Sequence, residues 1–573
     1  MSPLWEDVQH TLSTAWEDFK PPTLSNPWTA VGLVVGTIVC ALVVMYPLRA
    51  ARLPFRNLSG PAPSSVVFGS LADQVTGPVG GVYKAWAAKY GPTLRFRALL
   101  GSWRVVSTDL TAIGYVLNHT EEFHRESGFN ATMLLLCGKG VLAVEDAAHK
   151  RQRKILSPAF SLTNVKAMIP VFWNKAYDLA DALGKIVDDA DAGKGGPRGT
   201  PEGARSGALV DLLDFTIRAA LDVIGIVGFN YQFNAQKGLP NPLGDGFMDV
   251  MNSLSQISLF RLFQHSYPAL FAIPTNNTKA MKRTLVEQNR IGKEIVAARK
   301  KEFEREDVKL GKGAEVGKDT LSLLLKYNMA PDLKPSEKLT DEEVLGQIGS
   351  LMLAGNETSA TAMSWAAMHL YQNPDIQARL REEVDGVFDD RPEADDLMAL
   401  PYLDKFVREL LRFDPPLPEV VRECAKDAVV PLSTPVMGRD GKLMDSIVVS
   451  KGTEFVVPIN EINRSKEVWG PDADVFNPDR YDDATYPRAN VPGVWGNLIT
   501  FIGGPHNCLG WRFAILEIKT VLFVLLRSYE FVQPPAKPTM VRHGHAIVMR
   551  PHVAGEEDKG IQMPVLVRRV PKV

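Results

Sequence analysis

One cysteine, Cys508, follows a glycine-rich turn within the segment FIGGPHNCLG, and an apolar run typical of a helix begins at Leu509. Backbone amides and the positive end of a helix dipole favour a thiolate over a thiol at such a position. Because Gly510 has no side chain, a large flat group could lie against the start of this helix. A thiolate beneath a planar macrocycle predicts haem, with Cys508 as the axial iron ligand; an ordinary buried cysteine is the alternative.

A second group of residues lies in the middle of a long predicted helix. Ala354 and Gly355 leave space beside this helix, although a glycine there costs about 1 kcal/mol relative to alanine. The Thr358 hydroxyl should border the same gap, because residues three and four apart share a helix face. Glu357 adds an acid beside this hydroxyl. A packing glycine and a back-bonded threonine would give the same pattern, so the interpretation as a proton-delivering pair depends on Cys508.

Two charged segments have spacings that suit a helix. Glu409 and Arg412 are three residues apart and therefore lie on one helix face. The run from His149 to Lys154 is basic, as a solvated helix face often is. Neither segment predicts a site by itself.

The segments that must position these residues are mostly helical. A capping box at 340–343 begins the helix that carries Thr358, and Pro374 follows its predicted end. Two polar inserts, 188–207 and 309–318, are predicted to be surface loops. Other predicted elements are a helix at 82–90, a β-hairpin at 93–107, mostly helical patterns over 149–415 and a helix at 509–526. We therefore expect one large domain that is mainly α with small β-sheets, an α+β fold.

Composition excludes several classes of protein. Hydrophobic residues make up 45% and charged residues 23% of the 573-residue chain, as in ordinary globular proteins. The net charge of −2 gives no general attraction to nucleic acid. Four cysteines are too few for a disulfide framework, and their spacing matches no zinc site.

The N-terminal region predicts a membrane anchor. Residues 28–46 carry no charge and are long enough to cross a bilayer core of about 30 Å as a helix. Acidic residues precede this segment and arginines follow it, so the positive-inside rule places the body of the protein in the cytosol. A cleaved signal peptide, which would need a basic start, is the alternative. The predicted divisions are a lumenal tail (1–26), a transmembrane anchor (27–47), a Pro/Gly hinge (48–66) and a catalytic domain (67–573).

The cysteine loop resembles that of the cytochrome P-450 family of haem-thiolate monooxygenases, which reads Phe-x-x-Gly-x-Arg-x-Cys-x-Gly. Phe501, Gly504, Cys508 and Gly510 match this pattern, and His506 stands in place of the arginine. In the family, this arginine pairs with a haem propionate. A histidine can donate the same hydrogen bond but is a cation only below about pH 6.5 unless its pKa is raised. The variant looks like a fungal-type branch of the family.

Further motifs follow in the family's order, so that the resemblance covers residues 58–573. Glu409, Arg412 and Arg480 match the Glu-Arg-Arg group of the family. Residues 354–358 match the motif that opens a groove for dioxygen and relays protons, which implies that Thr358 and Glu357 are catalytic.

The resemblance also implies a set of haem-binding residues. Arg422 resembles the strand arginine that contacts a propionate, whereas His149 and Arg153 stand where the family has Trp-x-x-x-Arg. The implied set is Cys508, which is also the metal ligand, with His506, Arg422, Arg153, His149, Gly355, Phe501 and Gly510.

A cytochrome P-450 fold of this type implies heme b and insertion of one oxygen atom from O2 into a C–H bond. The chain has no dinucleotide fingerprint, so electrons from NADPH should arrive through a separate NADPH–cytochrome P-450 reductase, with cytochrome b5 as a second donor. The resemblance places the protein in the endoplasmic reticulum membrane with a single pass and a cytosolic catalytic domain. A basic docking face for the reductase is predicted from Lys150, Arg151, Arg153, Lys154, Arg512 and Lys519.

The substrate is expected to be a lipophilic small molecule, such as a terpenoid or another secondary metabolite. Apolar segments predicted to line its pocket are 133–136 and 417–421 together with Phe247, Met248, Met251, Leu254, Ile257 and Leu259, and 267–274 is predicted to touch the membrane. Two alternatives remain open: a haem-thiolate isomerase or dehydratase that does not use O2, and a non-enzymatic, membrane-tethered haem protein.

Overall fold

The chain divides into two units, 1–57 and 58–573, and everything described below lies in the second. The computed structural model describes residues 29, 31–33, 36, 37, 50–76, 81–194, 207–255, 258–307, 319–331, 333–543 and 548–570. Most of the predicted anchor and most of the two polar inserts therefore lie outside the described residues. Within the described residues, no single helix is long and apolar enough to cross a bilayer; one pair of helices, 146–160 and 162–191, bent by 50°, meets the length and composition test together.

The helix that carries Thr358 is α15 (Asp341–Gln372), and most of its residues are buried. Its predicted capping box is confirmed, because the Glu343 amide donates to the Thr340 hydroxyl (3.2 Å) and the Thr340 amide donates to the Glu343 carboxylate (2.9 Å). Pro374 begins the next helix, α16 (Pro374–Asp385). Helix α10 (Leu212–Phe229) packs along α15, and α21 (Trp511–Ser528) contacts α15 as well.

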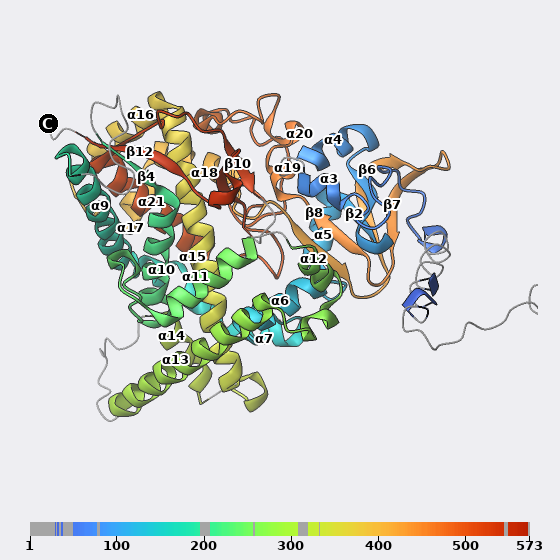
Figure 1. Cartoon of the computed structure of the whole chain (residues 1–573), viewed down its shortest axis with the longest axis horizontal. Helices are drawn as coiled ribbons and strands as arrows, with labels where there is room; N and C mark the ends of the chain where they lie inside the picture. The colour runs from blue at the N-terminus through green and yellow to red at the C-terminus, as the bar shows by residue number, and fades with distance from the viewer. Residues whose placement is uncertain are drawn as a thin grey trace, which may run out of the picture. The chain divides into compact units, whose positions relative to one another are not determined.

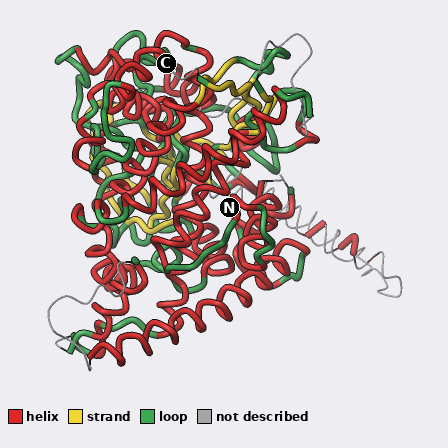
Figure 2. The backbone as a smooth tube through the Cα atoms, turned by 90° about the vertical axis from the view of Figure 1, so that its left-hand side faces the viewer, coloured by secondary structure: helices red, strands yellow, loops and turns green. Residues whose placement is uncertain are grey.

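Helices predominate in the rest of the unit, as Figure 2 shows. The helix predicted at 82–90 is confirmed as α4 (Gly81–Tyr90). The remaining α-helices among the described residues of this unit are α3 (Leu71–Thr76), α5 (Leu110–Asn118), α6 (Ser127–Cys137), α7 (Asp146–Leu156), α8 (Leu162–Lys166), α9 (Ile169–Asp191), α11 (Pro242–Ser255), α12 (Leu259–Ser266), α13 (Asn276–Asp307), α14 (Thr320–Met329), α17 (Ala394–Ala399), α18 (Pro401–Phe413), α19 (Ile459–Asn463) and α20 (Lys466–Trp469).

Four small sheets accompany the helices in the part of the chain that the structure describes. The largest has the strand order β1-β2-β8-β5-β3, in which β2 and β8 are parallel and the other pairs are antiparallel. The others have the orders β4-β12-β9, β6-β7 and β10-β11. The strands are β1 (Thr93–Arg97), β2 (Trp103–Ser107), β3 (Phe123–Arg125), β4 (Ala208–Asp211), β5 (Val420–Cys424), β6 (Ala428–Met437), β7 (Leu443–Val449), β8 (Glu454–Val457), β9 (Tyr529–Val532), β10 (Met540–His543), β11 (Arg550–Val553) and β12 (Pro564–Arg569).

The arrangement confirms a mainly α protein with small sheets. In Figure 1, helices α9, α10, α15 and α21 gather on one side of this unit, and β2, β6, β7 and β8 lie on the other. Two expectations about element ends were wrong. Helix α9 continues to Asp191, into the insert predicted to be a loop from residue 188. Helix α21 begins at Trp511 rather than Leu509, because the residues just before it form turns.

Candidate active site

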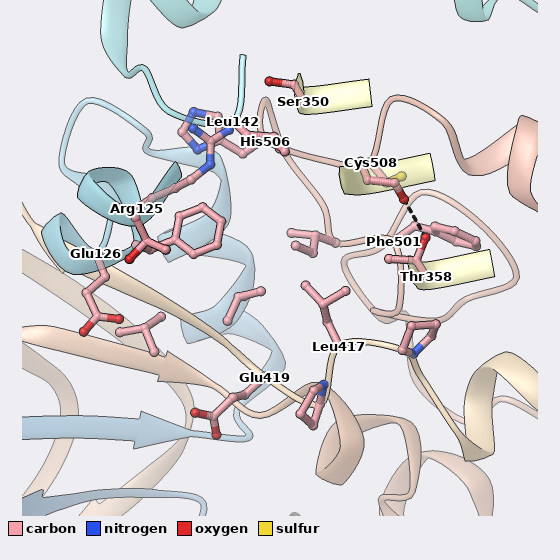
Figure 3. A pocket seen from close by; sticks show the side chains of 18 of the residues that line it. Arg125, Glu126, Leu142, Ser350, Thr358, Leu417, Glu419, Phe501, His506 and Cys508 are labelled. Carbon is pink, nitrogen blue, oxygen red and sulfur yellow. Dashed lines mark hydrogen bonds between the residues drawn. The ribbon is translucent and has the colours of Figure 1, made fainter. Parts of the chain in front are cut away.

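A cavity of about 630 Å³ borders α15, the loop 500–510 and the segment 416–422 that leads into β5 (Figure 3). Its lining is largely apolar. The predicted lining by 417–421, Met251 and Leu254 is confirmed. Contrary to the sequence prediction, the lining does not include 133–136, Phe247, Met248 or Leu259, and Ile257 lies outside the described residues.

A backbone hydrogen bond joins the two sides of the loop that carries Cys508. The Cys508 amide donates a hydrogen bond of 2.8 Å to the Phe501 carbonyl, and both residues line the cavity. At Gly504 the backbone has a φ of +68°, and an added Cβ would lie 2.1 Å from the Leu117 carbonyl oxygen. Only glycine fits at this position, so the glycine-rich turn serves to bring the loop close to its neighbour and to aim Cys508.

The Cys508 side chain is exposed to the cavity although it lies deep in the protein. Burial raises the pKa of its thiol to about 11, while the Gly510 amide and Arg153 act in the opposite direction. The backbone amide at the helix start therefore favours the thiolate, as expected, but burial outweighs this effect. A metal ion bound to the sulfur would remove the proton, because coordinating thiols are deprotonated.

Thr358 borders the same end of the cavity as Cys508 (Figure 3). Its hydroxyl donates a hydrogen bond of 2.7 Å to the Ala354 carbonyl, one turn earlier in α15. Since the hydroxyl proton is used in this bond, the lone pairs of the oxygen remain available to accept a hydrogen bond from a group in the cavity.

The two glycines predicted to leave space beside a helix, Gly355 for a ligand and Gly510 for a flat group, behave differently. An added Cβ at Gly355 would lie 2.7 Å from Cδ1 of Ile224, so this glycine lets α10 pack closely on α15, although it also lines the cavity. An added Cβ at Gly510 would find its nearest neighbour, a ring carbon of Phe160, at 3.7 Å. Space beside the backbone therefore remains at Gly510, as predicted, but not at Gly355.

Glu357 does not line the cavity. Its carboxylate is fully buried and accepts a hydrogen bond of 2.9 Å from Nε of Arg550, with Nη2 of the same guanidinium at 2.5 Å. The sequence interpretation, which placed this acid beside the Thr358 hydroxyl, is corrected, because Arg550 of β11 draws the carboxylate to another face of α15. A role for Glu357 in proton delivery remains a prediction.

Basic side chains gather at another part of the cavity wall. Arg125 of β3 and Arg422 of β5 are direct partners in neighbouring antiparallel strands, and both line the cavity. Like charges placed opposite each other destabilise a sheet. Arg125 contacts one acid, Glu145, at 3.1 Å. Within the described part of the chain, Arg422 forms no ion pair and donates a hydrogen bond of 3.1 Å to the adjacent Val421 carbonyl. Burial, and then Arg125, lowers the pKa of Arg422 to about 10.

Three residues predicted from the sequence join these two arginines. His149, Arg153 and His506 all line the cavity, and we call the five residues Arg125, His149, Arg153, Arg422 and His506 the basic cluster. The rings of His149 and His506 are 4.1 Å apart, edge to face. Burial and the nearby arginines lower the pKa of His149 to about 3 and hold that of His506 well below its ordinary value. Both histidines are therefore neutral, and His149 Nε2 and His506 Nδ1 lack hydrogen-bond partners among the described residues.

Comparison with known proteins decides the family. The model of the family "Cytochrome P-450" matches residues 59–554. The chain is 34% identical to cytochrome P-450 monooxygenase 205 of Postia placenta over 550 residues, which cover 94% of this chain and 98% of the relative. It is 35% identical to cytochrome P-450 monooxygenase claP of Ampulloclitocybe clavipes over 552 residues, or 94% of this chain and 97% of the relative. The chain belongs to the cytochrome P-450 family.

Membership confirms the predicted cytochrome P-450 fold and the enzyme class, monooxygenase, and implies haem. The site fits this group. Haem needs a ligand for its iron, space for its ring and partners for two anionic propionates. Cys508 faces the cavity, Gly510 leaves space beside it, and the basic cluster offers buried cations and unpaired ring nitrogens. Arg125 was not predicted from the sequence, because it belongs to no motif. It lies in the three-residue strand β3.

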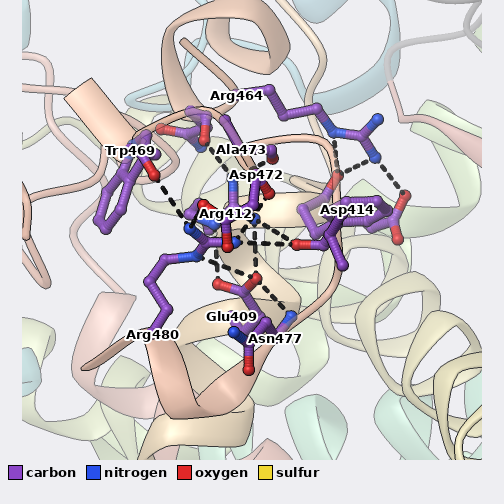
Figure 4. Close-up of polar contacts among 12 residues, drawn as sticks. Glu409, Arg412, Asp414, Arg464, Trp469, Asp472, Ala473, Asn477 and Arg480 are labelled. Atoms are coloured by element: carbon purple, nitrogen blue, oxygen red, sulfur yellow. Dashed lines mark hydrogen bonds and ion pairs between the residues drawn. The ribbon is translucent and has the colours of Figure 1, made fainter. Parts of the chain in front are cut away.

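A second group of buried charges positions the cysteine loop of this cytochrome P-450 (Figure 4). Glu409 binds Arg412 through two hydrogen bonds of 2.8 and 2.7 Å, and Arg480 approaches the same carboxylate at 3.5 Å. All three side chains are completely buried, so they are not the surface pair that their spacing alone would suggest. Helix α18, which carries Glu409 and Arg412, also accepts a hydrogen bond of 2.7 Å at the Leu411 carbonyl from the Thr500 hydroxyl at the start of the cysteine loop.

Proposed function

We propose that this monooxygenase inserts one oxygen atom from O2 into a C–H bond of a lipophilic small molecule, a terpenoid or another secondary metabolite. One observation carries the proposal: the Cys508 thiol and the Thr358 hydroxyl border the same end of a largely apolar cavity of about 630 Å³. Such a volume suits a small organic molecule, and the apolar lining favours one without charge.

Haem held by Cys508 and the basic cluster would supply the iron at which O2 is activated. The chain's own contribution near the iron ligand is the Thr358 hydroxyl. Its bond to the Ala354 carbonyl fixes the oxygen in place, so that it can accept a hydrogen bond and hold a proton at a defined position. The apolar walls exclude water, which keeps protons from reaching the reacting atoms by uncontrolled routes.

Electrons are proposed to come from NADPH through a separate reductase, with cytochrome b5 as a second donor. A docking face for an acidic partner is supported by Lys150 and Arg512, which are both exposed. Two other predicted members on the same helix as Lys150 have acidic partners within the chain: Arg151 pairs with Glu343, and Lys154 pairs with Glu337 at 3.0 Å. Lys519 does not belong to this face, contrary to the prediction, since it is buried and bound to Asp404 at 2.8 Å. Arg153 is directed to the Asn507 carbonyl at 2.7 Å instead.

The protein is further proposed to be held in the endoplasmic reticulum membrane by residues 27–47, with the catalytic domain in the cytosol. The support is the uncharged apolar run at 28–46 with arginines on its C-terminal side. Deletion of residues 1–48 should release the protein from the membrane fraction while haem binding persists. A truncated protein that still requires detergent for extraction would contradict this topology.

The activity is tested with holoprotein, reductase and NADPH, by measuring O2-dependent product against NADPH consumed. The informative pair of variants is Thr358→Val and Thr361→Val, two isosteric changes on the same helix. Thr361 is fully buried, does not line the cavity, and its hydroxyl has no partner among the described residues. We expect Thr358→Val to lower product per NADPH and release hydrogen peroxide, within the range of about 10²–10⁴-fold typical of acid–base catalysis.

Thr361→Val should keep its coupling. Equal coupling in both variants would show that protons reach the cavity by another route. Product formation that does not depend on O2 would contradict the proposed oxygen insertion itself.

A further inference from the structure

The cavity has a polar end. Figure 3 shows Glu419 and Glu126 on the side away from Cys508 and Thr358. Tyr83 and Glu461 also line the cavity. The sequence predicted an apolar wall here, from 417–421, and Glu419 is the exception within that segment. An acid at this position is unusual in a cavity whose lining is otherwise largely apolar.

Part of this polar end is satisfied by the protein. Glu126 binds Arg104 at 3.1 Å and His265 at 3.1 Å, and Arg104 also contacts Glu454. Burial alone would raise the pKa of Glu126, but His265 and Arg104 lower it to about 2. These four residues therefore neutralise one another and need no ligand.

Glu419 and Glu461 form no ion pair with these four residues. Neither acid forms an ion pair among the described residues; for Glu461 the structure has one long hydrogen bond, 3.4 Å, from the Asn460 amide. Both side chains retain partial exposure although they lie deep in the protein, so their exposed surface faces the cavity. Burial, and then Glu419, raises the pKa of Glu461 to about 8, and burial raises that of Glu419 as well. At neutral pH Glu461 therefore holds a proton.

Tyr83 provides an independent observation. It is only 5% exposed and lines the cavity. Its hydroxyl lies beside the Glu419 carboxyl, although the two form no hydrogen bond of normal geometry. Burial, followed by the nearby Glu419 carboxyl, raises the Tyr83 pKa well above its usual value, so the phenol remains protonated. A buried hydroxyl with a poorly aligned partner gains little of the roughly 1 kcal/mol that a good hydrogen bond contributes. A ligand that accepts from Tyr83 and donates to Glu419 would complete the hydrogen bonds of both groups.

We propose that Tyr83, Glu419 and Glu461 form a polar subsite that binds a hydroxyl group on an otherwise lipophilic substrate. The inference rests on the proposed function, because it describes the substrate of the same cavity. A hydroxyl both donates and accepts a hydrogen bond, as a protonated carboxyl does, so each can satisfy the other. An ionised carboxylate would find no cation among these three residues, and a hydrocarbon would leave the polar groups unsatisfied. The molecule would be held by its hydroxyl at one end, with its apolar body extending toward Cys508.

The test uses pairs of compounds in which a methyl group replaces the hydroxyl hydrogen. Dissociation constants are measured by equilibrium dialysis with the holoprotein, without NADPH, for alcohols and their methyl ethers on linear, monocyclic and polycyclic skeletons. A methyl ether accepts a hydrogen bond but cannot donate one. We expect alcohols to bind about two- to tenfold more tightly than their ethers, which is the range of one neutral hydrogen bond. If no pair favours the alcohol, the subsite is wrong.

Variants assign the effect to its residues. Glu419→Leu and Tyr83→Phe should each bring the alcohol-to-ether ratio close to one while leaving the affinity for the ether nearly unchanged. Glu467→Gln, an exposed acid near Glu461 in the sequence, serves as the control and should keep the full preference. An unchanged ratio in both Glu419→Leu and Tyr83→Phe would overturn the proposal.

The outcome is separable from that of the proposed function. The reduced carbon monoxide spectrum of each variant reports the haem-thiolate site, and O2-dependent product reports the activity. A normal spectrum and normal product with no preference for alcohols would remove the subsite alone. Loss of the spectrum in the unsubstituted protein would instead remove the function on which the subsite rests.

Discussion

Two groups of buried charge lie near the cysteine loop, and they are balanced in opposite ways. Around Glu409 each charge has a partner within the chain: the carboxylate binds Arg412 twice, and the two arginines of the group donate to backbone carbonyls such as Asn463 (2.9 Å) and Trp469 (2.9 Å). The basic cluster contains three arginines, and the acid nearest to it is Glu145. The first group completes the fold, whereas the second needs an anion that the described residues do not provide.

This difference separates scaffold from binding site without reference to any ligand. Burying a charge is costly, so a chain keeps unpaired buried cations only where something else neutralises them. The Glu409 group is therefore expected to contribute equally to the free energy of unfolding with and without haem. The basic cluster should matter mainly when haem is bound, and removing one of its cations should not harm the protein alone.

The largest effect is expected for Glu409→Gln. Removing this charge leaves Arg412 buried without a carboxylate, while Arg480 keeps Asp472 at 2.8 Å. Breaking a buried pair typically costs about 3–5 kcal/mol. The measurement is the free energy of unfolding in urea. Asp214→Asn is the matched control, because Asp214 forms an exposed pair with Arg218, worth less than about 1 kcal/mol. Equal losses in the two variants would show that the Glu409 group is no more important than a surface pair.

Arg422→Leu should weaken haem binding, whereas the stability of the haem-free protein should not fall. Charge-assisted hydrogen bonds contribute about 1.5–3 kcal/mol, so we expect haem to dissociate about 10- to 100-fold faster. The rate is measured by transfer of haem to an excess of a haem-scavenging protein, with Arg218→Leu as the surface control. In haem-free protein the same change should leave the unfolding free energy unchanged or raise it, since it removes a buried cation opposite Arg125.

An Arg422→Leu protein that loses as much stability without haem as with it would contradict the comparison. Arg422 would then belong to the scaffold, as Arg412 does.

The smallest effect is expected for His506→Arg, which introduces the residue usual in the family's loop. His506 is neutral in the basic cluster, and its Nε2 lies 3.3 Å from Glu145. An arginine would add a cation beside the propionates, so haem loss should slow by less than about tenfold, the range of one stronger hydrogen bond. Faster haem loss would mean that the cluster already carries as much positive charge as haem can balance.

The sequence predicted the residues that lie in continuous motifs. The cysteine loop, the helix with Thr358, the Glu-x-x-Arg pair and four members of the basic cluster could all be found in this way, because each occupies a characteristic spacing. Arg125 could not, since its role comes from the register that sets it opposite Arg422, a contact between distant parts of the chain.

The errors have the same origin. Glu357 and Thr358 are adjacent in sequence, but adjacent residues of a helix point in different directions, and Arg550, 193 residues away, binds the acid. Gly355 was predicted to leave space beside α15, but Ile224 of α10 occupies that space. Tyr83 and Glu461 lie in segments without any recognisable motif, and only the fold brings them to one cavity.

The most direct test of the central claim is the absorption spectrum of the reduced carbon monoxide complex in Cys508→Ala. Among the described cysteines, Cys508 alone faces the cavity, whereas Cys137 and Cys424 are buried elsewhere. The account predicts that Cys508→Ala abolishes the red-shifted band of a thiolate-ligated haem, and that Cys137→Ala and Cys424→Ala retain it. A red-shifted band that persists in Cys508→Ala would contradict the assignment of this cysteine as the iron ligand.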